Sequence, residues 1–161
     1  MSRKRCLTAS ASIGSVILLA LASVSIATAA TAQEKTYPVF TADQFVSAMK
    51  TVGLAFAAVD TSLAAGSVED SKAYLSISRE RLATTITFWR DRQKDDAIAQ
   101  LRDSLKKMDA LDAALSSPKA DLVAAAAAAR QVQSSCQPCH ALYREQDPNT
   151  KAYRLKPELT R

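Results

Sequence analysis

Apolar side chains recur every three or four positions along most of the chain after residue 40. This spacing predicts amphipathic helices, and no stretch shows the alternation that is typical of a strand. Four such helical stretches are separated by short polar or glycine-containing breaks. Beyond the first 32 residues the only glycines are Gly53 and Gly66, and alanine is abundant, which also favours helix.

The first predicted helix begins at Thr41, because Thr41 and Gln44 have the spacing of a capping box, and it stops at Gly66. The second begins at Ser67 and ends in the charged stretch 90–96. The inward face of the first helix consists of Phe45, Met49, Val52, Phe56, Val59 and Leu63. That of the second consists of Leu75, Leu82, Ile86 and Trp89.

The third predicted helix has an apolar face made of Ile98, Leu101, Leu105, Met108, Leu111 and Leu115. Ser117 and Pro118 predict the start of the fourth, which continues through an alanine run to about Glu145. Because the connections are short, the sequence predicts an all-α, antiparallel up-down-up-down four-helix bundle over residues 33–147. Residues 148–161, with Pro148 and Pro157, are expected to form an irregular C-terminal tail.

The first 32 residues have the layout of a secretory signal peptide. Arg3, Lys4 and Arg5 precede an apolar run, and Ala30-Thr31-Ala32 is a cleavage pattern. The apolar run is shorter than the roughly 20 residues of a membrane span, so we expect cleavage and no stable membrane insertion afterwards, with an uncleaved anchor as the alternative. Cleavage removes three basic side chains and Cys6. The formal charge of +5 is therefore partly a property of the leader.

The motif Cys136-Gln137-Pro138-Cys139-His140 is the attachment signature of a c-type haem. Two thiols form thioethers with the porphyrin vinyl groups, and the imidazole binds the iron from one side. On a helix the three side chains stand at i, i+3 and i+4, and therefore point to one side. The sequence predicts one covalently attached haem c per chain.

Other interpretations of the two cysteines remain open. A zinc site requires four ligands, and a second Cys/His pair is missing, since His140 is the only histidine. A redox dithiol belongs at the start of a helix after a strand, whereas this motif lies near the end of a helix. A disulfide between Cys136 and Cys139 in a haem-free helical protein is a further alternative, because an exported chain enters an oxidising compartment.

The second axial position of the iron decides what the haem does. Methionine opposite histidine raises the reduction potential and suits electron transfer, whereas an open face suits binding of a small gas. Met49 and Met108 both lie on inward helix faces, where most methionines simply fill the core. Gly53, one turn after Met49, favours Met49, because a missing side chain there leaves room for a porphyrin.

Two stretches resemble the class II cytochromes c, a four-helix family that includes cytochrome c′ and low-spin, methionine-ligated relatives. One is Cys136 to Arg144, in which an aromatic residue and an arginine follow the haem histidine; the other is Ala48-Met49-Lys50 with Gly53 close behind. The resemblance implies haem attachment at Cys136 and Cys139, proximal His140 and distal Met49. It also implies that Arg144 lies near the proximal side, and it implies a left-handed bundle, often a homodimer, in the periplasm.

The chain departs from that family in three places. Phe45 stands where an arginine is common, the link between the second and third helices is shorter, and the tail after Arg144 is longer.

The sequence therefore predicts a periplasmic electron carrier with a protein donor and a protein acceptor. The alternative is a five-coordinate, gas-binding haem protein. No catalytic constellation beyond the haem is visible, so we do not expect an enzyme. No basic stripe with interleaved aromatic residues supports nucleic-acid binding.

Overall fold

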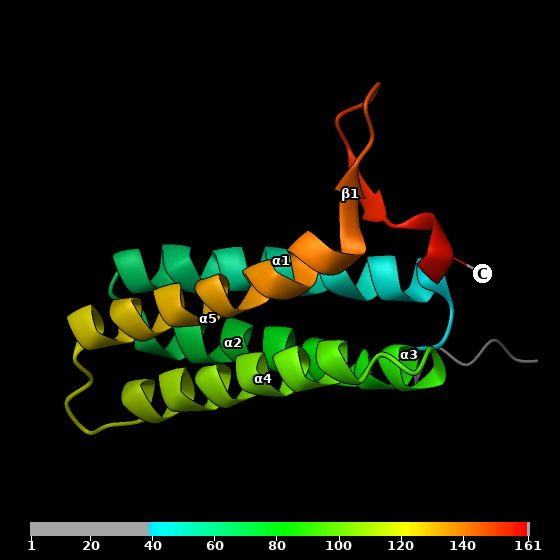
Figure 1. The fold of residues 1–161 in the computed structure, drawn as a ribbon. Helices are drawn as coiled ribbons and strands as arrows, with labels where there is room; N and C mark the ends of the chain where they lie inside the picture. The colour runs from blue at the N-terminus through cyan, green and yellow to red at the C-terminus, as the bar shows by residue number, and fades with distance from the viewer. Residues whose placement is uncertain (1–38, 161) are drawn as a thin grey trace, which may run out of the picture. The chain divides into compact units, whose positions relative to one another are not determined.

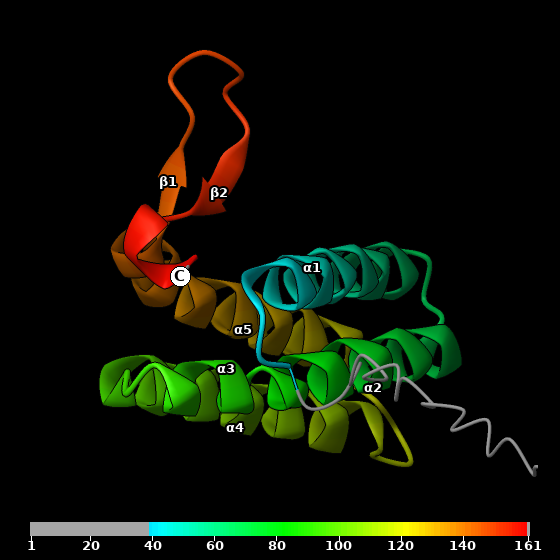
Figure 2. The same cartoon turned by 90° about the vertical axis from the view of Figure 1, so that its right-hand side faces the viewer.

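The computed structural model describes residues 39–160, which are mostly helical (Figure 1). The long helices are α1 (Ala42–Ala64), α2 (Val68–Thr84), α4 (Asp95–Leu115) and α5 (Leu122–Tyr143). The short elements are α3 (Ile86–Asp91), β1 (Arg144–Gln146), β2 (Tyr153–Leu155) and the 3-10 helix η1 (Pro157–Leu159). The four long helices lie side by side, as Figures 1 and 2 show. The predicted leader, residues 1–32, lies outside the described residues.

The start of α1 follows the predicted capping box. The Gln44 backbone N–H donates to Thr41 Oγ1 over 3.1 Å, and the Thr41 N–H donates to Gln44 Oε1 over 3.1 Å. After α1 the chain turns at Gly66, whose φ of +76° lies in the left-handed region that favours glycine. Ser67 caps α2, where its hydroxyl oxygen accepts from the Asp70 N–H. Local sequence chemistry thus accounts for this corner of the fold.

The second predicted helix is interrupted. It divides at Thr85 into α2 and α3, with three threonine hydroxyls bonded to nearby backbone carbonyls. Thr84 donates to the Arg81 carbonyl and Thr85 to the Leu82 carbonyl, each over 2.7 Å, and Thr87 donates to the Thr84 carbonyl over 3.1 Å. Such bonds compete with the helical ladder. The apolar spacing alone did not reveal this break.

The predicted start of the fourth helix at Pro118 is wrong. Helix α5 begins at Leu122, because the Asp121 carboxylate accepts from the N–H groups of Val123 (2.9 Å) and Ala124 (3.1 Å). One oxygen thereby satisfies two donors that a helix start leaves open. Residues 116–120 form the connection from α4.

The C-terminal segment is not an irregular tail. Strands β1 and β2 pair antiparallel, with Arg144 opposite Leu155 and Gln146 opposite Tyr153. The Asp147 carboxylate closes the turn by accepting from the Asn149 and Thr150 N–H groups. The hairpin projects from the end of α5 (Figures 1 and 2). The predicted boundary between residues 147 and 148 therefore runs through a single structural unit.

The core extends along the inward faces of the four long helices. The described residues include no helix that is both long and apolar enough to span a bilayer. Fully buried apolar side chains come from every long helix: Val59, Leu75, Met108, Leu111, Leu115, Ala125, Ala129 and Val132. At one end, Phe45, Phe88 and Trp89 pack with ring centroids 4.3 to 5.1 Å apart, and Tyr143 lies 4.8 Å from Trp89.

A polar contact joins the end of α5 to the start of α4. The Tyr143 hydroxyl donates to the carboxylate of Asp96 over 2.6 Å. This bond lowers the pKa of Asp96, because it stabilises the ionised carboxylate. A carboxylate whose pKa is lower in the folded than in the unfolded state stabilises the fold above its ordinary pKa, and this contribution is lost as the pH falls.

We therefore expect Tyr143→Phe to destabilise the protein at pH 7 and to have a smaller effect at pH 3, below the ordinary aspartate pKa of about 3.9, where this contribution is being lost. The phenyl ring keeps the packing against Trp89, so the variant removes only the hydroxyl. Urea unfolding at both pH values, followed by far-ultraviolet circular dichroism, measures the difference in the free energy of unfolding. An equal loss at both pH values would contradict the role of the Asp96 charge.

Candidate haem site

One cavity of about 310 Å³ brings together residues from helices far apart in the sequence. That volume lies at the lower end of the range of about 300–1,000 Å³ that ligand sites occupy. Its lining includes all the residues that the sequence predicted for the site: Met49, Gly53, Cys136, Cys139, His140 and Arg144. The structure thus places the methionine of α1 and the attachment motif of α5 on the same cavity.

The attachment motif occupies the last turns of α5. Cys136, Cys139 and His140 are all half-buried and line the cavity together, as their i, i+3, i+4 spacing requires. Pro138 lies inside the helix between them. Since proline has no N–H, it cannot donate to the Ser134 carbonyl, so the helical ladder has a gap beside the motif.

Both cysteines are free thiols. Burial raises the pKa of Cys139 to about 11 and also raises that of Cys136. A reactive dithiol depends on the opposite shift, because the thiolate is the nucleophile. These surroundings therefore do not favour the redox-dithiol interpretation.

The His140 side chain makes no hydrogen bond to any other residue in the part of the chain that the structure describes. Burial, and next the charge of Arg144, lower its pKa. Both effects favour the neutral imidazole over the imidazolium. Neutral imidazole is the form that binds a metal ion.

The two candidate methionines have different surroundings. Met49 is half-buried and lines the cavity, whereas Met108 is 1 % exposed and is not part of the cavity wall. Met108 packs in the core among the inward residues of α4 and its neighbours. Of the two, Met49 alone is placed to reach a group bound in this cavity.

Gly53 leaves open space on the α1 side of the cavity. A Cβ atom built at this position would have no atom within 4 Å of it, outside its own helix backbone. Gly53 lies in the middle of α1, so neither a turn nor a positive φ explains why a glycine stands there. Gly53 is exposed and lines the cavity together with Met49, so its missing side chain leaves room on that side.

An aromatic wall closes one end of the cavity. It is formed by Phe45, Trp89 and Tyr143. Phe45 packs in this wall with its ring centroid 4.9 Å from that of Trp89. The cavity lining also includes Gln100, whose Oε1 atom is buried and has no hydrogen-bond partner within residues 39–160.

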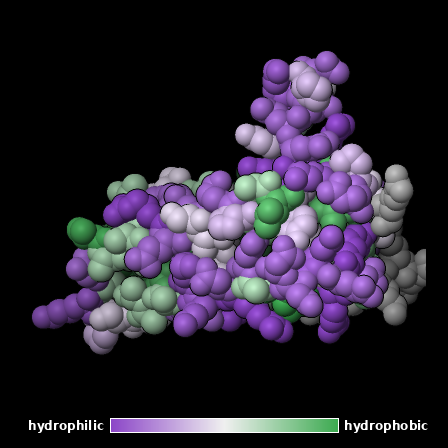
Figure 3. Space-filling model, in the orientation of Figure 1, coloured by the Kyte–Doolittle hydropathy of each residue, from purple (hydrophilic) through white to green (hydrophobic). Residues whose placement is uncertain are grey.

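The hairpin also contributes to the cavity, which the sequence did not predict. Tyr153, Arg154 and Leu155 of β2 all line the cavity. The turn residues around Asp147-Pro148-Asn149, between two short segments, were the signal that could have predicted it. The hairpin is covered mainly by hydrophilic side chains, and hydrophobic surface appears near its base (Figure 3).

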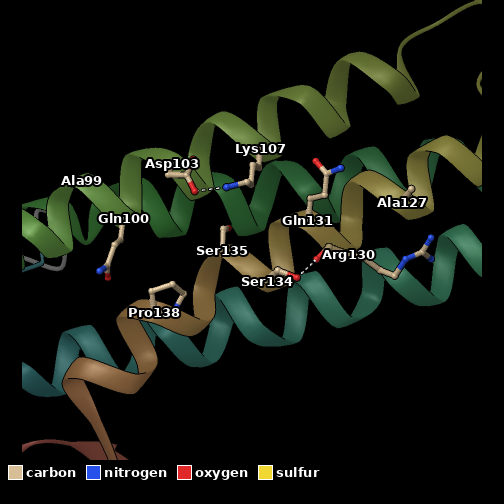
Figure 4. A pocket seen from close by; sticks show the side chains of 10 residues that line it. All are labelled: Ala99, Gln100, Asp103, Lys107, Ala127, Arg130, Gln131, Ser134, Ser135 and Pro138. Atoms are coloured by element: carbon tan, nitrogen blue, oxygen red, sulfur yellow. Dashed lines mark hydrogen bonds and ion pairs between the residues drawn. The ribbon is translucent and has the colours of Figure 1, made fainter.

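A second, open groove lies between α4 and α5 (Figure 4). It is lined by the other side of α5, including Arg130, Gln131 and Ser134. Asp103 and Lys107 in this groove form an ion pair with each other, one turn apart on α4. The groove contains no cysteine or histidine, and we assign no chemistry to it.

Within residues 39–160 no group of three or more His, Cys, Asp or Glu side chains is arranged to hold a metal ion. Comparison of the chain with protein-family models, with curated proteins and with solved structures gave no match.

Proposed function

We propose that this protein is a c-type cytochrome that carries one haem and transfers electrons. The observation that carries the proposal is the shared cavity, whose lining includes Met49 from α1 and Cys136, Cys139 and His140 from α5. The thioether of Met49 and the imidazole of His140 would bind the iron, and the two thiols would attach the haem covalently. Its apolar and aromatic lining suits the faces of a porphyrin.

The proposal also includes the directions of the four long helices and the cellular compartment of the protein. The four long helices alternate in direction, with α3 extending α2, as in the class II cytochromes c. A leader is removed after Ala32 and the mature protein works in the periplasm, where its donor and acceptor are redox proteins. The resemblance further implies a homodimer, which the molecular mass in solution tests.

The bound haem supplies one-electron chemistry between the ferric and ferrous states. His140 of α5 and Met49 of α1 would hold the iron, since both side chains line the same cavity. A methionine opposite a histidine favours the reduced state. The aromatic side chains make that end of the cavity less polar, and a less polar site likewise disfavours the additional charge of the oxidised iron.

The second candidate function is the binding of a small gas by a five-coordinate haem. The open space beside Gly53 is the observation that favours it, because room on the Met49 side can also admit a diatomic ligand. An optical spectrum separates the two functions. Low-spin bands with a weak near-infrared absorption support methionine ligation, whereas a high-spin spectrum that shifts at once with carbon monoxide supports gas binding.

The first test is the mass of the exported protein. With haem maturation active, we expect covalent haem to add on the order of 600 Da to the chain after removal of the leader. Replacing both Cys136 and Cys139 by Ser should abolish this addition. Cys6→Ser is the matched control and should keep it, because Cys6 lies in the leader. Wild-type protein without the added mass would refute the cytochrome proposal.

The second test is Met49→Ala. We expect this variant to keep the haem attached and to become high-spin, because the thioether is lost while both cysteines remain. Met108→Leu removes a thioether from the core and should remain low-spin. Absorption spectra of the oxidised and reduced proteins measure both variants. A low-spin Met49→Ala protein would show that another group binds the iron.

The third test uses Gly53→Leu. In a haem-free protein with both cysteines replaced by Ser, we expect Gly53→Leu to raise the thermal stability. Glycine costs about 0.8–1.0 kcal/mol relative to alanine in a helix interior, and leucine ranks just below alanine. In the haem-loaded protein, the added side chain should disturb the porphyrin and lower the low-spin fraction. Gly53→Ala adds only a Cβ atom and should therefore have a smaller effect on the haem spectrum than Gly53→Leu. A haem spectrum that Gly53→Leu leaves unchanged would mean that the glycine is merely tolerated.

A further inference from the structure

The charged side chains on the cavity wall are all basic. Lys50, Arg144 and Arg154 line it, and none of its lining residues within 39–160 is an aspartate or a glutamate. Three cations around an apolar cavity disfavour a purely apolar occupant, because like charges repel and each loses some solvation. They suit an occupant that brings negative charge to the cavity mouth.

The three cations differ in their partners. Arg154 is held by two carboxylates of its own hairpin, with Nε 2.9 Å from Glu145 Oε1 and an Nη1 atom 3.2 Å from Asp147 Oδ2. Arg144 and Lys50 make no ion pair with any residue that the structure describes. Their N–H donors therefore remain available to a ligand.

The hairpin fixes the position of the Arg144 guanidinium. Arg144 follows α5 directly, and its backbone N–H donates to the His140 carbonyl. Its guanidinium carbon lies 4.0 Å from the centre of the Tyr153 ring, which belongs to the opposite strand. Leu155, which pairs with Arg144 in the register, is buried and anchors β2. Stacking on an aromatic face orients the guanidinium plane and leaves its edge donors free.

We propose that Arg144 and Lys50 form an anion site at the cavity mouth that receives the propionate carboxylates of the haem, and that Tyr153 is the positioning residue that holds Arg144 there. The site rests on the proposed function, since it needs the haem. Carboxylates match the planar donors of arginine, and lysine adds a point charge. The C-terminal hairpin thereby fixes a positive charge close to the haem.

This arrangement has a defined effect on the redox equilibrium. A fixed cation near the haem disfavours the more positive ferric state, and it keeps the propionates ionised at lower pH. Removing the cation should lower the reduction potential. It should also make the potential depend on pH between neutral and mildly acidic conditions, because the propionates then take up protons more easily.

The experiment measures the reduction potential of the haem-loaded protein from pH 5 to 8. For Arg144→Gln we expect a shift in the redox equilibrium of about tenfold at pH 7, or about 59 mV for a one-electron couple, toward the ferric state. A steeper pH dependence should accompany it. Lys50→Gln should act in the same direction. Arg130→Gln, an equal charge change on α5 away from the cavity, is the control and should stay close to the wild type.

Tyr153 is tested by a double-mutant cycle. Tyr153→Leu should lower the potential in the wild-type background, Tyr153→Phe should restore it, and Tyr153→Leu should add nothing when Arg144 is already Gln. A Tyr153→Leu effect that persists without Arg144, or an Arg144→Gln protein that matches the Arg130→Gln control, overturns the inference. Mass spectrometry of each variant detects the attached haem. A protein without haem would contradict the proposed function, whereas a haem-loaded protein with unchanged potentials would contradict only the anion site.

Discussion

The fold depends on one geometric constraint, which is that Cys136, Cys139 and His140 share a single face of α5. A helix face that borders a cavity cannot also pack tightly against a neighbouring helix. The packing of α5 therefore comes from earlier turns of the same face, where the side chains are small: Ala125 and Ala129, which precede Cys136 by eleven and seven residues, are fully buried. Small residues let the backbone of α5 approach its neighbours closely, while α4 supplies the larger Leu and Met side chains.

A cavity in a domain of this size forfeits packing contacts that the core would otherwise make. The structure concentrates large aromatic rings beside it. Phe45, Phe88, Trp89 and Tyr143 form a continuous cluster at that end of the bundle. Their edge-to-face and stacked contacts, together with the bond from Tyr143 to Asp96, give the cavity a rigid wall. The site is thus held open by packing around it.

The two ends of the described chain are joined at the same place. Arg92 donates to the Phe40 carbonyl over 2.9 Å and to the Leu159 carbonyl over 3.1 Å, and its guanidinium lies 3.7 Å from the Phe88 ring centre. One side chain thereby connects the segment before α1, the aromatic cluster and the segment after the hairpin. This connection explains why the C-terminal residues are ordered against the bundle and can contribute to the cavity.

The sequence alone determined the features that depend on local chemistry. The capping box at Thr41, the cap at Ser67 and the glycine turn at Gly66 each follow from neighbouring residues, and the structure confirms them. The apolar spacing likewise predicted the four long helices. It missed the break at Thr85 and the start of α5 at Asp121, because side-chain bonds to the backbone, rather than periodicity, set those boundaries.

The candidate site likewise combines features that the sequence determined with features that only the tertiary structure decided. The spacing of Cys136, Cys139 and His140 fixed their common face, because helical geometry relates residues only a few positions apart. Whether Met49 or Met108 shared a cavity with them depended on how distant helices pack, and the tertiary structure placed Met49 there. The hairpin and its Tyr153–Arg144 contact depended on the tertiary structure for the same reason, since a pairing between strands is decided by long-range contacts that local patterns do not encode.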